Sequence, residues 1–233
     1  MNGVDAVVIT LALLLQGPGI GGDARDMASQ HNALIAAGGV VLAAGAYVAA
    51  DDLRSELDGP MHGPSRLTDV YGSGSFNLPA SLSIWALGEV GNREGLRDLG
   101  ADLTRTLTLT QFAVAPIKLA TRRRRPDGSS LRSFPSGHTA SAFAAARLIQ
   151  RRYDMRWAWP LYILGACTGA GRVAGGHHYV SDVVMGAATG IIVGSSVKLR
   201  GDEAPPAYTG TDRVTIVPKV TPGGGSLRLT IRL

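Results

Sequence analysis

The chain has 233 residues, a formal net charge of +5 and no internal repeat, which excludes a repeat array and suits a single domain with a sizeable core. Its one cysteine, Cys167, excludes an intramolecular disulfide framework. The positive charge favours anionic partners, which include phosphorylated metabolites, anionic lipid surfaces and nucleic acid, and it does not choose among them.

The N-terminal segment contains an apolar run at residues 6–15 that has the length of a signal-peptide core, and residues 22–24 could precede a cleavage site. No lysine or arginine precedes the run, and Asp5 stands where a signal peptide carries positive charge. Residues 1–24 are therefore a candidate signal or anchor segment, and its cleavage stays open.

An uncharged stretch rich in Ala, Val, Leu and Gly runs from Ala33 to Ala50 and is about as long as the shortest spanning helix. Its small residues also fit a helix packed tightly among others, and the sequence leaves both possibilities open. Residues 51–75 are charged and rich in glycine and proline, which predicts a polar loop with at most a short helix.

Helical patterns continue down the chain, and most of them are too short or too polar to span a membrane cleanly. The predicted helices cover approximately residues 77–92, 101–121, 138–152, 157–173 and 178–198. We therefore predict an all-α fold over residues 25–200, a bundle of about five to seven helices.

The C-terminal region departs from the helical pattern. Residues 201–212 contain acidic residues, prolines and glycines that break it, and residues 214–233 alternate apolar and polar side chains around a proline and three glycines at 222–225. Residues 201–233 are therefore predicted to be a linker followed by a β-hairpin, packed at the edge of the bundle.

The first candidate for chemistry is a basic segment in which Lys118 is followed by arginines at 122–125 and by Pro126. Pro126 must stop or kink the preceding helix. Positions seven apart on a helix lie on nearly the same face, so Lys118 and Arg125 are expected to bring two cations to one spot. Taken alone, the arginine run also fits a solvated basic face or a nucleic-acid patch.

The second candidate is the sequence Ser136-Gly137-His138, which precedes an alanine-rich helix. Ser136 is the expected N-cap, and the free backbone amides of the first turn, with Gly137 permitting close approach, form an anion site. His138 would then lie beside a bound phosphate, placed to donate a proton to a leaving oxygen. Such a sequence is also often no more than a helix cap.

The third candidate runs from Arg172 through a glycine-bearing turn to His178 and Asp182. A helix that begins near His177 would place His178 and Asp182 on one face. A hydrogen bond between one ring nitrogen and Asp182, or a backbone carbonyl, would leave the other nitrogen free to attack phosphorus. The alternative is a metal site of both histidines, Asp182 and His138, which is disfavoured because the nearby cations would repel a divalent ion.

Taken in this order, the motifs Lys-x6-Arg-Pro, Pro-Ser-Gly-His and Arg-x5-His-x3-Asp resemble the type 2 phosphatidic acid phosphatase superfamily. That superfamily also includes bacterial class A acid phosphatases and vanadium haloperoxidases. The motifs agree in order and internal spacing, and they span Lys118 to Asp182, a little over a quarter of the chain. Gly171 departs from the pattern, because the family usually has a serine before the arginine, so one phosphate hydrogen bond is lost or replaced.

The resemblance implies a phosphohistidine mechanism without metal or cofactor. The residues that it assigns to binding the phosphoryl oxygens are Lys118, Arg125, Ser136, Gly137 and Arg172.

The resemblance also assigns the catalytic roles. His178 attacks phosphorus in line, Asp182 orients the ring of His178, and His138 protonates the leaving oxygen and then activates water. We expect the adjacent His177 and the arginines at 122–124 to take no part.

Two alternatives of other classes stay open. The residues assigned to binding phosphate could instead hold vanadate, which would make the protein a vanadate-dependent haloperoxidase. Alternatively, residues 122–125 could form a non-catalytic module that binds acidic lipid or nucleic acid. We favour a phosphatase whose partners are a phosphorylated small molecule or lipid and a membrane surface, with no nucleic acid and with the oligomeric state open.

The basic segment also bears on location. An embedded enzyme with an outward-facing site would place residues 122–125 on the translocated side, against the usual excess of Lys and Arg in cytoplasmic loops. We therefore expect a domain in the cell envelope, periplasmic or outward-facing, and either soluble or membrane-associated.

Overall fold

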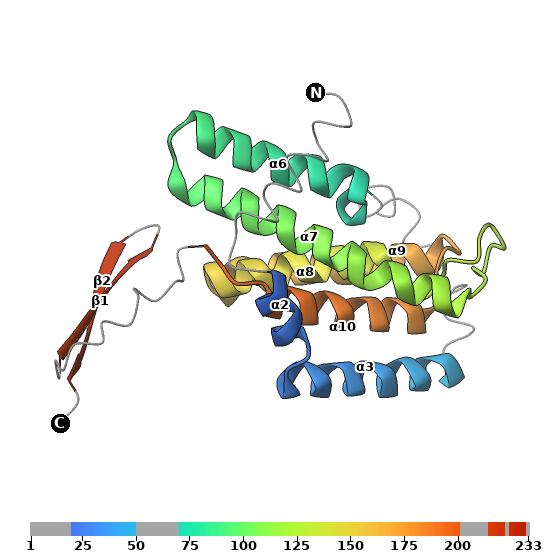
Figure 1. The fold of residues 1–233 in the computed structure, drawn as a ribbon. Coiled ribbons are helices and arrows are strands. Elements are labelled where there is room, and N and C mark those ends of the chain that lie inside the picture. The colour runs from blue at the N-terminus through green and yellow to red at the C-terminus, as the bar shows by residue number, and fades with distance from the viewer. Residues whose placement is uncertain (1–19, 50–69, 201–213, 222–223, 232–233) are drawn as a thin grey trace.

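The computed structural model describes residues 20–49, 70–200, 214–221 and 224–231. Its helices are α2 (Ile20–Met27), α3 (Gln30–Ala49), α6 (Gly74–Val90), α7 (Glu94–Thr121), α8 (Gly137–Arg152), α9 (Met155–Ala174) and α10 (Val180–Ser196). The five helical patterns predicted after residue 76 correspond to α6 to α10, so the all-α prediction is confirmed for the bundle (Figure 1). Most of the candidate signal segment and of the predicted 51–75 loop lies outside the described residues.

Helix α7 begins earlier than its sequence pattern predicts, at Glu94 rather than near residue 101. The reason is close packing against α6. A Cβ atom placed on Gly88 of α6 would lie 2.1 Å from the backbone nitrogen of Arg97, and one placed on Gly100 would lie 2.2 Å from that of Trp85. The two backbones therefore touch where glycines replace side chains, and this tertiary contact extends α7 beyond its apolar pattern.

The helices are arranged around α8, which packs against α7, α9 and α10 (Figure 1). Helix α6 lies along α7 on one side of the bundle, and α3 lies along α10 on the opposite side. The centre is built from small side chains: Ala140, Ala142, Ala144 and Ala146 of α8 are all fully buried. Small residues let the helix axes approach closely, and this brings the start of α8 beside the start of α10.

Helix α3 is the one described helix that is long and apolar enough to cross a membrane, judged by length and composition only. It packs on α10 along one side, and most of its apolar side chains face away from the protein: Val41, Leu42 and Val48 are 66 to 85% exposed. The interpretation of this stretch as a helix packed tightly among others is therefore wrong, and its interpretation as a membrane span stays open.

Buried ion pairs explain the charged residues of α7. Arg105, only 1% exposed, forms an ion pair with Asp23 of α2. Asp102 is fully buried and accepts hydrogen bonds from Arg152 Nη1 at 2.9 Å and from the backbone N–H of Arg200 at 3.0 Å. Burial raises the pKa of Asp102 to about 6. These contacts join α7 to α2 and to the ends of α8 and α10.

Beyond the bundle, the strands β1 (Val214–Thr221) and β2 (Gly224–Ile231) pair antiparallel, with Val214 opposite Ile231 and Thr221 opposite Gly224 (Figure 1). The hairpin predicted from the sequence falls on this segment. Its packing at the edge of the bundle stays a prediction, as do the domain boundaries at residues 24 and 200.

Candidate active site

The candidate residues lie at one end of the bundle, where α7 and α9 end and α8 and α10 begin. Helix α7 ends at Thr121 because Arg122 adopts a left-handed conformation (φ 46°, ψ 34°), and the Arg122 N–H donates to the carbonyl of Lys118 at 3.1 Å. Lys118 therefore lies in the last turn of α7, whereas Arg125 lies in the following loop. The expectation that Lys118 and Arg125 share a helix face is wrong.

The loop nevertheless folds back on itself. The N–H of Arg125 donates to the carbonyl of Ser130 at 3.0 Å, and the N–H of Ser133 donates to the carbonyl of Arg123 at 3.0 Å. These two bonds close the loop and return Arg125 toward the end of α7.

Three cations gather in this region. Lys118 Nζ donates to the carbonyls of Arg132 at 2.8 Å and Pro135 at 2.6 Å, which fixes the ammonium group against the loop. Burial lowers the pKa of Lys118 to about 8, and the positive charges of Arg125 and Arg172 contribute to the same shift. Arg172, 6% exposed, lies in the last turn of α9. Lys118, Arg125 and Arg172 are thus close enough to influence one another.

Helix α8 begins at this cation cluster. Ser136 is its N-cap: the Ser136 hydroxyl oxygen accepts from the Thr139 N–H at 3.4 Å and from the Thr139 hydroxyl at 3.0 Å. A Cβ atom on Gly137 would lie 3.8 Å from Lys118 Cε, so the first turn of α8 adjoins the lysine. His138 follows in the same turn, where its Cβ and carbonyl pack against Gly72, just before α6.

His178 lies in the turn between α9 and α10 and is 2% exposed. Its backbone N–H and that of His177 both donate to the carbonyl of Arg172, at 3.1 and 3.0 Å, which holds the turn against the end of α9. His178 Nδ1 lies 3.6 Å from Asp182 Oδ2, a facing contact longer than a hydrogen bond. Burial lowers the pKa of His178, and the charges of Lys118 and Arg172 reinforce the shift against the opposing effect of Asp182. The neutral imidazole, which is the nucleophilic form, is therefore favoured.

His178 and Asp182 do not meet on a helix face as expected, because α10 begins only at Val180 and His178 precedes it. Instead Asp182 closes the N-terminus of α10: its Oδ2 accepts from the Tyr179 N–H at 2.9 Å. The same oxygen accepts from the Ser133 hydroxyl at 2.5 Å. Burial raises the pKa of Asp182, but the His178 ring, Ser133, Tyr179 and the neighbouring Arg123 outweigh burial and hold the pKa below its ordinary value.

Arg123 is the residue that sequence reasoning missed. Its Nη1 donates to Asp182 Oδ1 and to Ser181 Oγ, both at 2.7 Å. Its guanidinium lies 4.0 Å from the ring centroid of Tyr179 and 5.3 Å from that of Tyr47 in α3. Of the arginines at 122–124, Arg123 contacts Asp182, while Arg122 and Arg124 are exposed, and the expectation that these three take no part in the chemistry stays a prediction. No sequence motif identifies Arg123. The one signal is that a buried carboxylate such as Asp182 requires a cation beside it.

His177 points elsewhere. Its Nδ1 lies 3.0 Å from Asp127 Oδ2, and the Asp127 N–H donates to the carbonyl of Gly176 at 2.9 Å, so this pair joins the α7–α8 loop to the α9–α10 turn. Within residues 20–49 and 70–200, no three His, Cys, Asp or Glu side chains are grouped so as to hold a metal ion.

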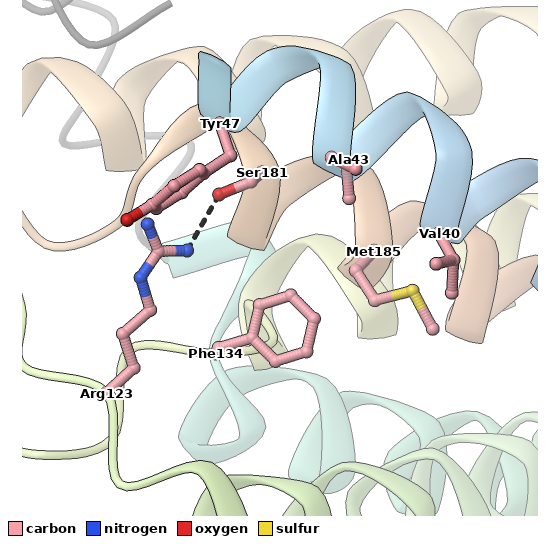
Figure 2. Close-up of a pocket in the computed structure, with 8 residues that line it drawn as sticks. Val40, Ala43, Tyr47, Arg123, Phe134, Ser181 and Met185 are labelled. Atoms are coloured by element: carbon pink, nitrogen blue, oxygen red, sulfur yellow. Dashed lines mark hydrogen bonds between the residues drawn. The ribbon is translucent and has the colours of Figure 1, made fainter.

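A pocket of about 320 Å³ lies beside Arg123, between α3 and α10 (Figure 2). Its lining residues are Val40, Ala43, Ala44, Tyr47, Arg123, Phe134, Ser181 and Met185. None of the three clustered cations and neither His138 nor His178 lines this pocket. It is therefore an apolar cavity on the Arg123 side of Asp182 and not the place where the cations gather.

A helical bundle with three clustered cations, a helix N-terminus and a buried His–Asp pair at one end has the arrangement expected of a phosphate-binding site. The family comparison agrees: residues 100–200, a little over two fifths of the chain, match the model described as the PAP2 superfamily. The resemblance predicted from the three motifs is confirmed.

Individual relatives are phosphatases of bacteria. The chain is 37% identical over 120 residues to the lipid A 1-phosphatase of Porphyromonas gingivalis, and the matched region covers 50% of this chain and 27% of that protein. It is 33% identical over 119 residues to the undecaprenyl-diphosphatase BcrC of Bacillus subtilis, and the matched region covers 48% of this chain and 61% of that protein. The matches therefore span about a quarter and about three fifths of the length of these relatives.

Two solved structures are also similar. The PAP2-type phosphatidylglycerolphosphate phosphatase of Bacillus subtilis is 23% identical with a TM-score of 0.45, over 82% of this chain and 90% of that one. LpxE of Aquifex aeolicus is 24% identical with a TM-score of 0.43, over 66% of this chain and 90% of that one.

Proposed function

We propose that the protein is a metal-independent phosphatase that hydrolyses phosphate monoesters or diphosphates of lipids or polyprenyl carriers through a phosphohistidine. The observation that carries the proposal is the environment of His178. This histidine is buried, its Nδ1 faces a carboxylate, and its neutral form is favoured by burial and by the charges of Lys118 and Arg172.

In the proposed reaction the phosphoryl group is bound by cations and amides. Lys118, Arg125 and Arg172 neutralise its oxygens, and the first turn of α8 at Gly137 offers backbone N–H groups and the positive end of the helix dipole. Ser136 contributes at the same turn, where its hydroxyl also caps the helix. Such preorganised donors stabilise the charge that spreads over the equatorial oxygens in the transition state.

The chemical steps then follow from the two histidines. The lone pair on His178 Nε2 attacks phosphorus, the bond from phosphorus to the leaving oxygen breaks, and His138 gives that oxygen its proton. In the second step His138 takes a proton from water, the resulting hydroxide attacks phosphorus, and the P–N bond breaks to release phosphate and neutral His178. Asp182 faces Nδ1 throughout and keeps the ring oriented.

A lipid or polyprenyl substrate is favoured over a soluble one for two reasons. Both curated relatives are named for lipid A or undecaprenyl diphosphate as substrate. The exposed apolar face of α3 would also hold the enzyme at a membrane, where such substrates reside. The same grounds support a location in the bacterial cell envelope, and an outward-facing site is part of the proposal that they do not test.

The test is phosphate release from a lipid phosphate, a polyprenyl diphosphate and a soluble aryl phosphate, without added metal. We expect the wild type to turn over at least one lipid substrate and His178→Ala to lose activity nearly completely. His177→Ala is the matched control, because its ring pairs with Asp127, and it should retain activity. Rapid acid-free quenching with radiolabelled substrate should show labelled protein in the wild type and none in His178→Ala. Retained turnover in His178→Ala would contradict the proposal.

A further inference from the structure

The Arg123 side chain is held in place by hydrogen bonds and by aromatic rings, although it belongs to a loop. Its guanidinium bonds two neighbouring residues of α10, Ser181 and Asp182, through one nitrogen. Two aromatic rings flank it, Tyr179 from the turn before α10 and Tyr47 from α3. Figure 2 shows Arg123 reaching up between Tyr47 and Ser181 at the edge of the apolar pocket. A side chain with this many partners has one orientation, and it gives that orientation to the carboxylate that it binds.

The carboxylate in question is the one that faces the proposed nucleophile. Asp182 is fully buried, and its Oδ1 is bound by Arg123 while its Oδ2 accepts from Ser133 and Tyr179 and faces His178 Nδ1. Ser133 and the Tyr179 N–H fix Oδ2 only. Without Arg123, the carboxylate can rotate about Oδ2 and Oδ1 loses its charged donor.

We propose that Arg123 is a positioning residue for the reaction: it holds Asp182, and through Asp182 the ring of His178, in the orientation from which Nε2 attacks. This inference rests on the proposed phosphohistidine function. Arg123 is assigned a positioning role because its Nη1 bonds Ser181 and Asp182, and Asp182 in turn faces Nδ1 of His178, the ring nitrogen that does not attack in the proposed reaction.

The position of Arg123 predicts which kinetic constant responds. Loss of Arg123 should lower kcat, because ring orientation is lost, and should leave KM near the wild-type value, because the three binding cations stay in place. A charge-assisted hydrogen bond that acts on a reacting group contributes between about tenfold and a hundredfold in rate. Arg123→Gln should therefore reduce kcat by that factor.

The pH profile should respond as well. The groups that face Asp182 are Arg123, Ser133, Tyr179 and His178. The charge of Lys118 acts on both Asp182 and His178, and the charge of Arg172 acts on His178. Removing the guanidinium charge raises the pKa of Asp182 and leaves its negative charge less compensated, which raises the pKa of His178. Activity needs ionised Asp182 and neutral His178, so the acid limb of kcat/KM should move to higher pH.

The experiment compares Arg123→Gln, Arg123→Lys and the neighbouring control Arg124→Gln in full-length protein, with thermal unfolding of each variant. Arg124 is an exposed arginine of the same loop, so its variant should match the wild type in kcat, KM and pH profile. Arg123→Lys keeps the charge and should keep the acid limb, with kcat between the wild type and Arg123→Gln. A cycle with Asp182→Asn completes the set: when Arg123 acts through Asp182, the double variant loses no more than Asp182→Asn alone.

The outcomes separate this inference from the proposed function. An inactive wild type, or an active His178→Ala, removes the proposed function. An active wild type with inactive His178→Ala and an unchanged Arg123→Gln overturns the positioning role alone. A rise in KM without loss of kcat, or multiplicative losses in the cycle, would also overturn it. Should Arg123→Gln fail to fold, Arg123→Lys decides the matter through its kcat and KM.

Discussion

The contact between α10 and the start of α8 supports a prediction in which a single methyl group displaces the site. Gly186 of α10 faces the N-cap of α8: a Cβ atom added there would lie 2.5 Å from the carbonyl oxygen of Ser136. Real Cβ atoms essentially never come within 3.0 Å of such an atom, so one helix must move by at least about 0.5 Å. The turn that moves carries Gly137 and His138.

The magnitude follows from opposing terms. Overpacking costs about 1–3 kcal/mol, whereas Gly→Ala in a helix gains roughly 0.5–1 kcal/mol in helix propensity. Gly186→Ala should therefore lower the unfolding free energy by about 1–2 kcal/mol and Tm by about 2–8 °C. A 1 Å misplacement of catalytic groups costs about a hundredfold in rate, and half that displacement should reduce kcat by about tenfold.

Two glycines serve as comparators for Gly186→Ala. Gly194 is equally crowded, with a Cβ position 2.7 Å from the carbonyl of Ala144, but it lies two turns further from His138. Gly194→Ala should lose stability and keep kcat. Gly45 of α3 has no atom within 4 Å of its Cβ position, so Gly45→Ala should not destabilise the fold. Thermal unfolding and initial rates measure both effects; an unchanged Tm and kcat in Gly186→Ala would refute the reasoning, and so would an equal loss of kcat in Gly194→Ala.

Two further predictions concern pH. Burial raises the folded-state pKa of Asp102 from 3.8 to about 6, so its contribution to stability is present below pH 4 and is lost as pH rises through 6, a change of about 3 kcal/mol. Unfolding of the wild type and Asp102→Asn at pH 4 and pH 7 should show the wild type losing most of that free energy relative to the variant, and a constant difference would contradict it. The lowered pKa of Lys118, about 8, predicts that inhibition by inorganic phosphate weakens above pH 8 as the ammonium loses its proton. In Lys118→Arg, inhibition by inorganic phosphate should stay unchanged from pH 8 to pH 10. An equal weakening of inhibition in the wild type and in Lys118→Arg would rule out Lys118 as the titrating cation.

The sequence predicts the helices of the bundle well because their boundaries depend on local residues. Ser136 at the N-cap of α8 and the glycines after α9 mark helix ends that any chain of this pattern would have. The early start of α7 could not be predicted in this way. It depends on backbone contact with α6 at Gly88 and Gly100, and that contact joins two helices whose packing no local pattern records.

The candidate site residues likewise fall into those that the sequence could predict and those that it could not. The three motifs identify residues whose chemistry is distinctive, such as Lys118, His178 and Asp182, and family resemblance supplies their roles. The left-handed residue Arg122, by contrast, ends α7 with no glycine to announce it. The loop geometry that follows decides which of the four consecutive arginines comes near Lys118 and which one bonds Asp182, so counting along a helix could not place Arg125 and Arg123.

Asp182 contacts both the start of α8 and the turn that carries His178, so a substitution of Asp182 has more than one effect. Its carbonyl accepts from the Ser136 N–H at 2.9 Å, which ties the N-cap of α8 to the first turn of α10. Its carboxylate closes the start of α10 through Tyr179 and also faces His178. A loss of activity in Asp182→Asn therefore combines ring orientation with helix capping. The Arg123 side chain hydrogen-bonds the carboxylate and Ser181 and contacts the rings of Tyr179 and Tyr47, whereas the cap of α10 is made by the Asp182 carboxylate itself. Variants of Arg123, measured against Asp182→Asn, therefore separate the orientation of the nucleophile from the stability of the helix that carries it.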